Sequence, residues 1–244
     1  MVRQTLDQGL TLARCATAQV GHRTRGSVWR RFRLGVAKTS GDVAPYAEQW
    51  TASNAQASTG NGPLWAVLGD SAAQGIGAPA FDRGYVGMVR ERLDARDGVA
   101  WRVLNLSRSG ARAADVADQQ LRLLAEVEAE ADLVTCIVGG NDLLRTRVLA
   151  AEASFRTIMA GLPHGAVIGT VPQGLAGTKA RRLNAMIRAE APRAGLRVAD
   201  VWAHTGPPWR GKYSEDFFHP NEVGYRDWAR AIEEALGLRS NVRR

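Results

Sequence analysis

A serine that follows a run of apolar residues is the first candidate for chemistry in this chain. The segment Leu64–Leu68 is continuously apolar and leads into Gly69, Asp70 and Ser71, a pattern that predicts a buried strand ending in a tight turn. Ligands bind at the carboxyl ends of strands in open parallel sheets. A serine placed there, among backbone N–H groups, suits a nucleophile whose attack creates an oxyanion, although a serine at a strand end is more often a simple helix cap.

Two glycine-containing turns follow later apolar segments. The first is Asn105–Gly110, where Gly110 lets the backbone approach a ligand and leaves its N–H free to donate. The second is Gly139–Asp142, where the Asn141 amide is suited to donate to a developing negative charge. Alternatively, Gly110 only eases a turn and Asn141 only caps a helix.

A carboxylate and an imidazole lie close together near the C-terminus. Asp216 precedes His219 by three residues, a spacing that brings them together on a turn, so that Asp216 can hold Nδ1–H and leave Nε2 of His219 free as a base. The rival base His204 has Val201 in the corresponding position. We expect the remaining histidines, His22 and His164, to be structural or exposed.

The elements between these groups alternate between strand and helix, which predicts a parallel sheet covered on both faces. We expect strands at Leu64–Leu68, Val99–Leu104, Leu133–Val138, Ala166–Val171 and Leu196–Val201, and helices at Gly84–Ala95, Ala113–Glu130, Ala151–Ala160, Lys179–Glu190 and Asn221–Leu236. Residues 1–20 can form a short helix, and the polar, small residues 51–63 are typical of a linker. The expected organisation is a basic arm and linker over residues 1–60, followed by one domain over residues 61–244.

Taken together, the four groups resemble the SGNH/GDSL hydrolase superfamily over residues 64–236. The resemblance implies an α/β fold, a flavodoxin-like three-layer α/β/α sandwich with five parallel strands in the order 2-1-3-4-5. It implies Ser71 as nucleophile, His219 as base and Asp216 as its orienting partner, with the Ser71 N–H, the Gly110 N–H and the Asn141 side chain as the oxyanion hole. The chain departs from many members at Ala72, where they have Leu, which concerns the shape of the acyl pocket.

The expected reaction is cleavage of a small carboxylic ester or thioester through an acyl-enzyme. Water as acceptor gives an esterase or lipase, and an alcohol as acceptor gives an acyltransferase. The residue two after Ser71 is Ala73, so the chain lacks the Gly-x-Ser-x-Gly turn of α/β-hydrolases. The residues expected to bind substrate are Arg108, Arg112, Arg145, Arg147, Trp209 and Tyr213.

Four of those residues are arginines that flank the two glycine turns, and they suggest a substrate with an anionic group near its ester, such as a lysophospholipid or a phosphate-bearing acyl donor. The alternative is that these guanidinium groups pair with nearby acids, among them Asp115, Asp118 and Glu152. Trp209 and Tyr213 either line the acyl site or pack the proline-rich loop that precedes Asp216.

The positive charge of the chain is concentrated at its N-terminus. The formal net charge is +8, and residues 1–40 contain eight basic residues and one acid. Such an arm can bind anionic membranes or nucleic acid, or it can be a solvated segment that packs on the domain. Because residues 41–244 are close to neutral, a nucleic-acid-binding protein is disfavoured, and a catalytically inactive binding module is disfavoured by the complete set of catalytic side chains.

Other compositional features restrict the class of protein. The two cysteines, Cys15 and Cys136, lie in unrelated contexts, which fits a reducing compartment rather than a disulfide framework. We identify no secretory signal and no apolar run long enough to span a membrane, so we expect a cytoplasmic protein with peripheral membrane contact as an option. No Cys/His cluster has metal-ligand spacing, and we expect no metal and no cofactor.

Overall fold

The computed structural model describes residues 25–127, 131–173 and 177–238 of the 244-residue chain. Its five strands form one parallel sheet in the order β2-β1-β3-β4-β5, which confirms the expected topology. The strands are β1 (Leu64–Gly69), β2 (Arg102–Asn105), β3 (Leu133–Ile137), β4 (Val167–Gly169) and β5 (Arg197–Ala199). All six residues of β1 are buried, as expected for an interior strand of a sheet that is covered on both faces.

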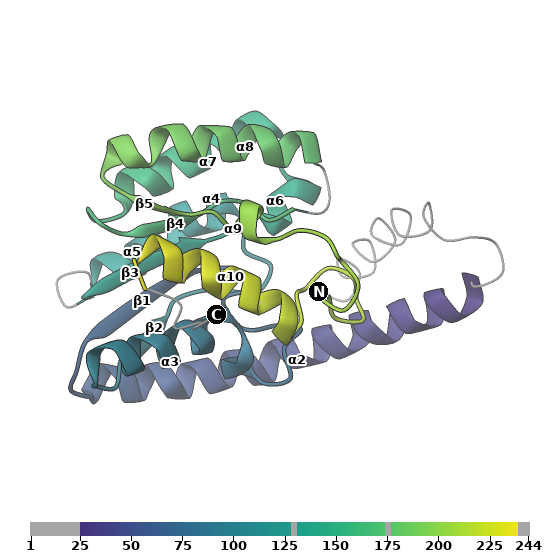
Figure 1. Cartoon of the computed structure of the whole chain (residues 1–244), viewed down its shortest axis with the longest axis horizontal. Coiled ribbons are helices and arrows are strands. Elements are labelled where there is room, and N and C mark those ends of the chain that lie inside the picture. Colours follow the sequence, from purple (N-terminus) through teal and green to yellow (C-terminus); the bar gives the residue numbers. More distant parts are fainter. Residues whose placement is uncertain (1–24, 128–130, 174–176, 239–244) are drawn as a thin grey trace, which may run out of the picture.

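Helices cover both faces of the sheet, giving three layers (Figure 1). Alternate residues of β1 point to opposite faces: Ala66 and Leu68 pack with one group of helices, and Trp65 and Val67 pack with the other. The first group contains α4 (Ala113–Asp115), α5 (Leu121–Ala125), α7 (Val148–Gly161) and α8 (Gly177–Glu190), and the second contains α3 (Tyr85–Asp97) and α10 (Glu222–Ala235).

The helix predicted over residues 113–130 is divided in its described part. A five-residue π-helical segment, Val116–Gln120, separates α4 from α5. The side chain of Gln120, the last residue of this segment, points into the protein and is 3 % exposed. Two further short helices that periodicity did not predict, α6 (Gly140–Arg145) and α9 (Val201–His204), follow β3 and β5.

A long N-terminal helix, α2 (Arg25–Thr59), corrects the expectation of a linker over residues 51–63, because residues 51–59 are helical. The helix buries Tyr46, Trp50 and Ala57. Asn54 exchanges two hydrogen bonds with the backbone of Asn105, at 2.9 and 2.8 Å. Because β2 is an edge strand, α2 satisfies backbone groups that would otherwise face solvent. The helix predicted within residues 1–20 lies outside the described residues.

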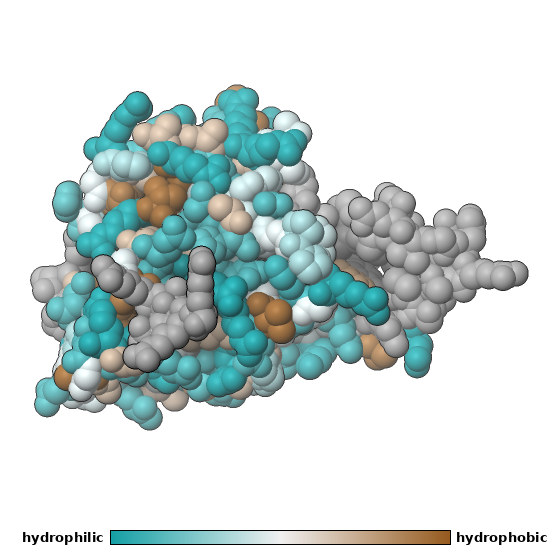
Figure 2. All heavy atoms as spheres, viewed as in Figure 1, coloured by the Kyte–Doolittle hydropathy of each residue, from teal (hydrophilic) through white to brown (hydrophobic). Residues whose placement is uncertain are grey.

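The surface viewed in Figure 2 is mostly hydrophilic, with hydrophobic side chains in small separate patches. Among the residues that the structure describes, no helix is both long enough and apolar enough to cross a bilayer. The buried apolar residues form two clusters, one in each layer between the sheet and the helices, and loops and the short helices α6 and α9 follow the strands at the carboxyl edge of the sheet.

Candidate active site

The Ser71 side chain lies at the end of β1, next to an imidazole. Its Oγ is 2.9 Å from Nε2 of His219, which is 148 residues away in the sequence. Ser71 is 6 % exposed, and the turn that carries it is closed by the Ala73 N–H donating to Asp70 O at 3.1 Å. The serine is thus held in a tight turn with its hydroxyl directed at the imidazole ring of His219.

The loop from Ser214 to His219 positions a carboxylate behind that imidazole. Asp216 Oδ2 is 2.6 Å from His219 Nδ1, and Asp216 Oδ1 accepts from Ser214 Oγ and from the backbone N–H groups of Phe218 and His219, at 2.6, 2.9 and 2.9 Å. Burial alone would raise the pKa of Asp216, but the nearby His219 and these hydrogen bonds lower it below its ordinary value. The local Asp-x-x-His spacing therefore produces the expected contact.

Three N–H donors come from three separate segments: the turn after β1, the loop after β2 and the start of α6. The N–H groups of Ser71 and Gly110 donate to no acceptor within the described part of the chain. Gly110 has φ +80°, a left-handed conformation that favours glycine. Asn141 Nδ2 donates to Ala111 O at 3.0 Å, which uses one of its two hydrogens and brings Asn141 beside Gly110.

Gln120 is a supporting residue that the sequence analysis missed. Its Oε1 accepts from the Gly69 N–H at 2.9 Å, and its Nε2 donates to the Gly69 carbonyl at 2.8 Å. The side chain thus holds both polar groups of the backbone two residues before Ser71. The sequence contained a signal for this role. Gln120 is a polar residue four positions after Val116 and four before Leu124, a spacing that places it on the same face of a helix as these two apolar residues.

A second polar network braces the loop that carries Gly110. Asn105 Nδ2 donates to Ala73 O at 2.8 Å, and Asn105 Oδ1 accepts from the Ser107 N–H at 3.1 Å. Gln74 Nε2 donates to Ser107 O at 3.1 Å, and its Oε1 accepts from Ser109 Oγ at 2.6 Å. These bonds tie the segment after Ser71 to the segment before Gly110, so the two loops hold each other in place.

Two more buried carboxylates lie beside these loops. Asp70 is 6 % exposed and accepts the Ala72 N–H at 3.0 Å, and burial raises its pKa to about 6. Asp142 is fully buried and accepts the Ala113 N–H at 2.8 Å, and burial raises its pKa as well. Asp142 therefore connects the turn that carries Asn141 to the start of α4.

The four arginines of the predicted substrate site differ in their surroundings. Arg108 and Arg112 both pair with Asp115, at 3.2 and 3.4 Å, which is the pairing given above as the alternative. Arg145 is exposed and makes no ion pair within the described residues. Partial burial and the nearby charge of Arg112 lower the pKa of Arg145. Arg147 is also exposed, at the start of α7.

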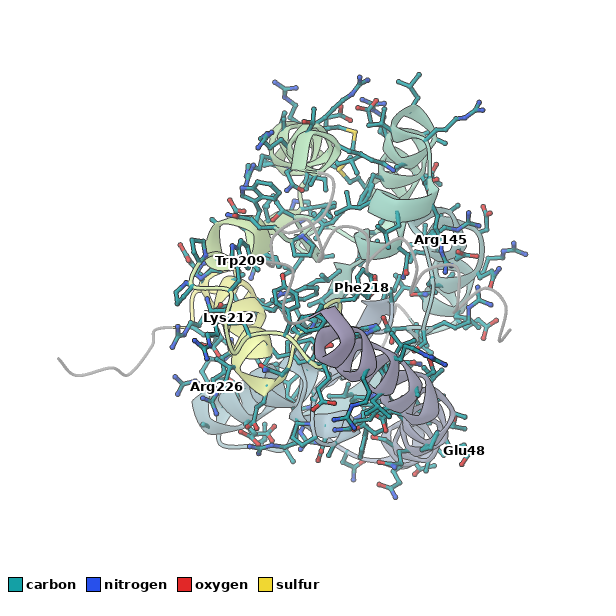
Figure 3. The ribbon with its side chains drawn as sticks, turned by 90° about the vertical axis from the view of Figure 1, so that its right-hand side faces the viewer. Glu48, Arg145, Trp209, Lys212, Phe218 and Arg226 are labelled. Atoms are coloured by element: carbon teal, nitrogen blue, oxygen red, sulfur yellow. The ribbon has the colours of Figure 1, made fainter. Side chains whose placement is uncertain are left out.

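Of the two aromatic residues in the proline-rich loop, Trp209 is exposed and Tyr213 is partly buried. The Trp209 and Tyr213 rings lie 6.2 Å apart. Trp209 is 38 % exposed, whereas the Tyr213 hydroxyl donates to Gln173 O at 3.3 Å and burial raises its pKa to about 12. Figure 3 looks onto the carboxyl edge of the sheet, with Trp209 and Arg145 on opposite sides of Phe218.

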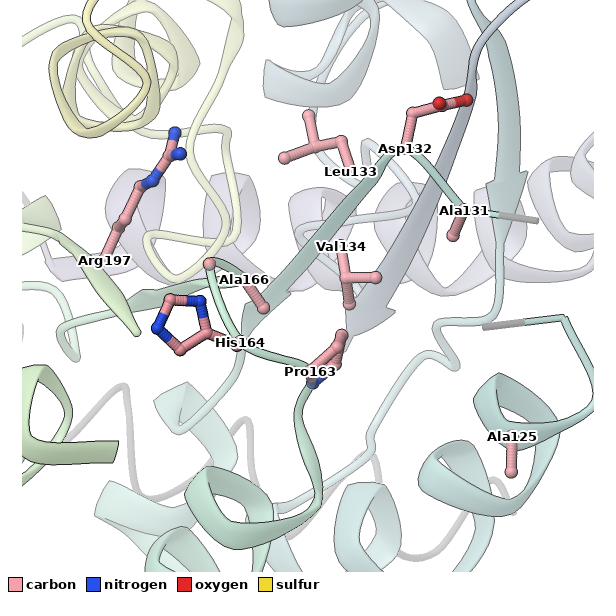
Figure 4. A pocket seen from close by; sticks show the side chains of 10 residues that line it. Ala125, Ala131, Asp132, Leu133, Val134, Pro163, His164, Ala166 and Arg197 are labelled. Atoms are coloured by element: carbon pink, nitrogen blue, oxygen red, sulfur yellow. The ribbon is translucent and has the colours of Figure 1, made fainter. Parts of the chain in front are cut away.

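The other histidines lie elsewhere. His204 Nε2 is 2.7 Å from Glu234 Oε2 on α10, and His22 lies outside the described residues. His164 lines a surface hollow of about 540 Å³ together with Asp132 and Arg197 (Figure 4). Because Asp132 precedes β3 and Arg197 begins β5, this hollow lies at the amino edge of the sheet, opposite Ser71. The described residues contain no group of His, Cys, Asp and Glu that could hold a metal ion.

A parallel sheet of order 2-1-3-4-5, with a serine, a glycine, an asparagine and an Asp-x-x-His pair at its carboxyl edge, defines a hydrolase of the SGNH type. A family model described as "GDSL-like Lipase/Acylhydrolase family" matches residues 67–226. Because this match covers more than half of the chain, the chain belongs to the GDSL-like lipase/acylhydrolase family and is a carboxylic ester hydrolase by class.

Solved structures share the fold at low sequence identity. The lipase Lip_vut3 from a goat rumen metagenome has a TM-score of 0.63 at 16 % identity, covering 71 % of this chain and 97 % of that one. TesA has a TM-score of 0.61 at 21 % identity, with coverage of 71 % and 97 %. Axe2, an acetylxylan esterase from Geobacillus stearothermophilus, has a TM-score of 0.59 at 21 % identity, with coverage of 74 % and 96 %. No curated protein matches the chain significantly.

Proposed function

We propose that the chain cleaves small carboxylic esters through an acyl-enzyme on Ser71. The observation that carries the proposal is the continuous hydrogen-bonded chain from Ser71 Oγ to His219 Nε2, at 2.9 Å, and from His219 Nδ1 to Asp216 Oδ2, at 2.6 Å. A nucleophile next to a base that a third group orients is the arrangement that activates a serine.

In this mechanism Oγ of Ser71 attacks the ester carbonyl while His219 Nε2 takes the hydroxyl proton. The carbon–oxygen bond to the alcohol breaks, and His219 returns the proton to the leaving alcohol. Water, activated by His219 in the same way, then releases the acid. Asp216 holds the imidazole with its Nδ1–H toward the carboxylate, so that Nε2 accepts the proton.

The Ser71 N–H, the Gly110 N–H and Asn141 Nδ2 supply the oxyanion donors in this proposal. Two observations support it: the first two groups have no acceptor within the described residues, and Asn141 has one hydrogen not used by Ala111 O. Each donor is expected to contribute on the order of 3 kcal/mol in the transition state. The same acyl-enzyme would serve an acyltransferase, and comparing hydrolysis with transfer to added alcohols distinguishes the two activities.

The nucleophile is tested by labelling. We expect a fluorophosphonate probe to modify Ser71 in the wild type, with the site located by mass spectrometry, and we expect Ser71→Ala to abolish both labelling and hydrolysis of a short-chain aryl ester. The melting temperature should change little, because a turn serine makes few buried contacts. Ser154→Ala, at a serine on α7 that bonds only to Ala150 O, is the control for a serine-to-alanine change away from the site. Labelling of the wild type at another residue would refute the proposal.

A second prediction concerns the charge of the substrate. We propose that Arg145, exposed and one helical turn after Asn141, favours an ester that carries an anionic group. Arg145→Ala should lower kcat/KM for an anionic ester about tenfold, since one charge-assisted contact is worth roughly 1.5 kcal/mol, and leave a matched neutral ester unaffected. Arg193→Ala, before β5 at the opposite edge, is the control. Equal effects on both esters would contradict this assignment.

A further inference from the structure

The N-terminal helix α2 touches the loop that carries the proposed catalytic carboxylate. Gly35 is buried against the Glu215–Asp216 peptide, and a Cβ placed on Gly35 would lie 2.5 Å from Asp216 N and still closer to the Glu215 carbonyl. The two backbones therefore pack directly on each other. Only glycine permits this approach, since real Cβ atoms essentially never come within 3.0 Å of other heavy atoms.

The same helix holds a second segment that touches the imidazole residue. Tyr46 Oη donates to Ala78 O at 3.0 Å. The preceding residue, Gly77, lies against His219, because a Cβ placed there would be 2.8 Å from His219 Cβ and 2.5 Å from Pro220 O. α2 thus contacts the backbone on one side of the Asp216–His219 turn directly and reaches the other side through residues 77–78.

Contacts farther along α2 reach the other loops of the site. Trp50 Nε1 donates to Gln74 O at 3.2 Å, on the segment after Ser71. Asn54 holds the backbone of Asn105, whose side chain braces Ser107 before Gly110. One helix therefore contacts the loops that carry Ser71 and Asp216 and the end of β2, which leads into the Gly110 loop, although the family match begins only at residue 67.

We propose that α2 is a positioning element of the catalytic apparatus, with Gly35 as the residue that lets it set the Asp216 carboxylate against His219. This inference rests on the proposed function. It differs from the view of residues 1–60 as a peripheral arm, because a peripheral arm could be displaced without any effect on turnover.

The chain offers a matched pair of glycines for the test. Gly35 and Gly41 lie on the same helix, and a Cβ placed on Gly41 meets nothing within 4 Å. Both changes to alanine add the same helix propensity, about 1 kcal/mol, but only Gly35→Ala places a methyl group against the Glu215–Asp216 peptide. In the full-length chain we expect Gly41→Ala to keep wild-type kcat and KM, and Gly35→Ala to lower kcat on the order of 10- to 100-fold, with KM within about twofold.

A spectroscopic measurement reports the position of Asp216 without any reaction. The His219 Nδ1–H proton in its hydrogen bond to Asp216 should give a downfield proton resonance in the wild type and in Gly41→Ala. We expect it to be shifted or lost in Gly35→Ala, and Asp216→Asn provides the reference for its loss. If Gly35→Ala fails to fold, Tyr46→Phe, which deletes one hydroxyl, should lower kcat about threefold or more with KM unchanged.

The outcomes separate the two proposals. A wild type that neither hydrolyses esters nor accepts the fluorophosphonate refutes the proposed function, and the resonance then decides the positioning role by itself. The inference is overturned if Gly35→Ala has the same kcat and the same downfield resonance as Gly41→Ala. If Gly35→Ala does not fold, the inference is overturned when Tyr46→Phe has the wild-type kcat.

Discussion

Two buried carboxylates near Ser71 have their pKa values shifted in opposite directions. Asp216 has its pKa lowered despite burial, because His219 and three hydrogen-bond donors stabilise its charge. Asp70 has its pKa raised to about 6 by burial, which outweighs the hydrogen bond from Ala72 and the nearby His219. Only Asp216 is therefore suited to remain ionised beside His219 across the neutral and mildly acidic range.

The Asp70 shift predicts a pH-dependent stability. The pKa of Asp70 is higher in the folded chain than the value of 3.8 expected for the unfolded chain. The folded state therefore binds more protons than the unfolded state between pH 4 and 6. The contribution of Asp70 to the free energy of unfolding consequently falls as the pH rises through that window. Asp70→Asn should remove this loss. The change that it causes in the free energy of unfolding should be on the order of 3 kcal/mol more favourable at pH 7 than at pH 4.

Urea denaturation of both proteins at the two pH values measures this difference. Asp82→Asn, at a residue that is not buried, is the control for removing one carboxylate from the same loop region. A free-energy difference between wild type and Asp70→Asn that is the same at pH 4 and pH 7 would contradict the raised pKa.

At the scale of the element, the π turn at Val116–Gln120 replaces part of a predicted regular helix. Gln120, the last residue of this segment, lies on its buried side, where one side chain bonds both backbone groups of Gly69. Single π turns inside helices are frequent at functional sites. Here the turn connects the layer of α4 and α5 to the backbone that leads into Ser71.

Removing this amide should destabilise the fold. Gln120→Met keeps a side chain of similar length but leaves the buried Gly69 N–H without a partner, at a cost of about 1–3 kcal/mol, and leaves the Gly69 C=O with only the 3.4 Å bond from the Arg108 N–H. Gln119→Met, at the exposed neighbouring position, should be nearly neutral. Urea denaturation measures both variants, and equal midpoints would show that Gly69 does not depend on Gln120.

At the scale of the whole molecule, charge and apolar exposure occur together on the N-terminal part of α2. Arg30, Arg33 and Lys38 are exposed there, and Leu34 is 55 % exposed. A basic surface with exposed apolar side chains is typical of segments that contact anionic membranes. Because Gly35 lies against the loop that carries Asp216 and His219, such a contact would bring the membrane close to the candidate active site.

We therefore expect the full chain to co-sediment with vesicles that contain anionic lipid and to be released by salt, because screening weakens charge attraction. Replacing the three basic residues by glutamine should weaken binding about 100-fold, at roughly 1 kcal/mol per charge. The control removes three exposed arginines elsewhere, Arg181, Arg193 and Arg197. Equal losses in both variants would indicate an effect of net charge alone.

Much of the fold and of the candidate site could be predicted from the sequence, because local patterns define both. Continuous apolar runs identify the central strands, and strands that alternate with helices must lie parallel, which places their carboxyl ends at one edge. Ser71, Gly110 and Asn141 each follow such a strand, and the Asp216–His219 contact follows from a spacing of three residues. These predictions need no knowledge of distant contacts.

Only the tertiary structure decided which distant groups meet. The 2.9 Å contact of Ser71 with His219 joins positions 148 residues apart, and the contact of Gln120 with Gly69 joins positions 51 residues apart. Residues 51–59 have the composition of a linker, yet they are helical: the helix gains its stability from Trp50, Asn54 and Ala57 docking on the sheet. Local propensity is weak compared with such packing, which is why the contact of α2 with the loops of the candidate site became visible only in three dimensions.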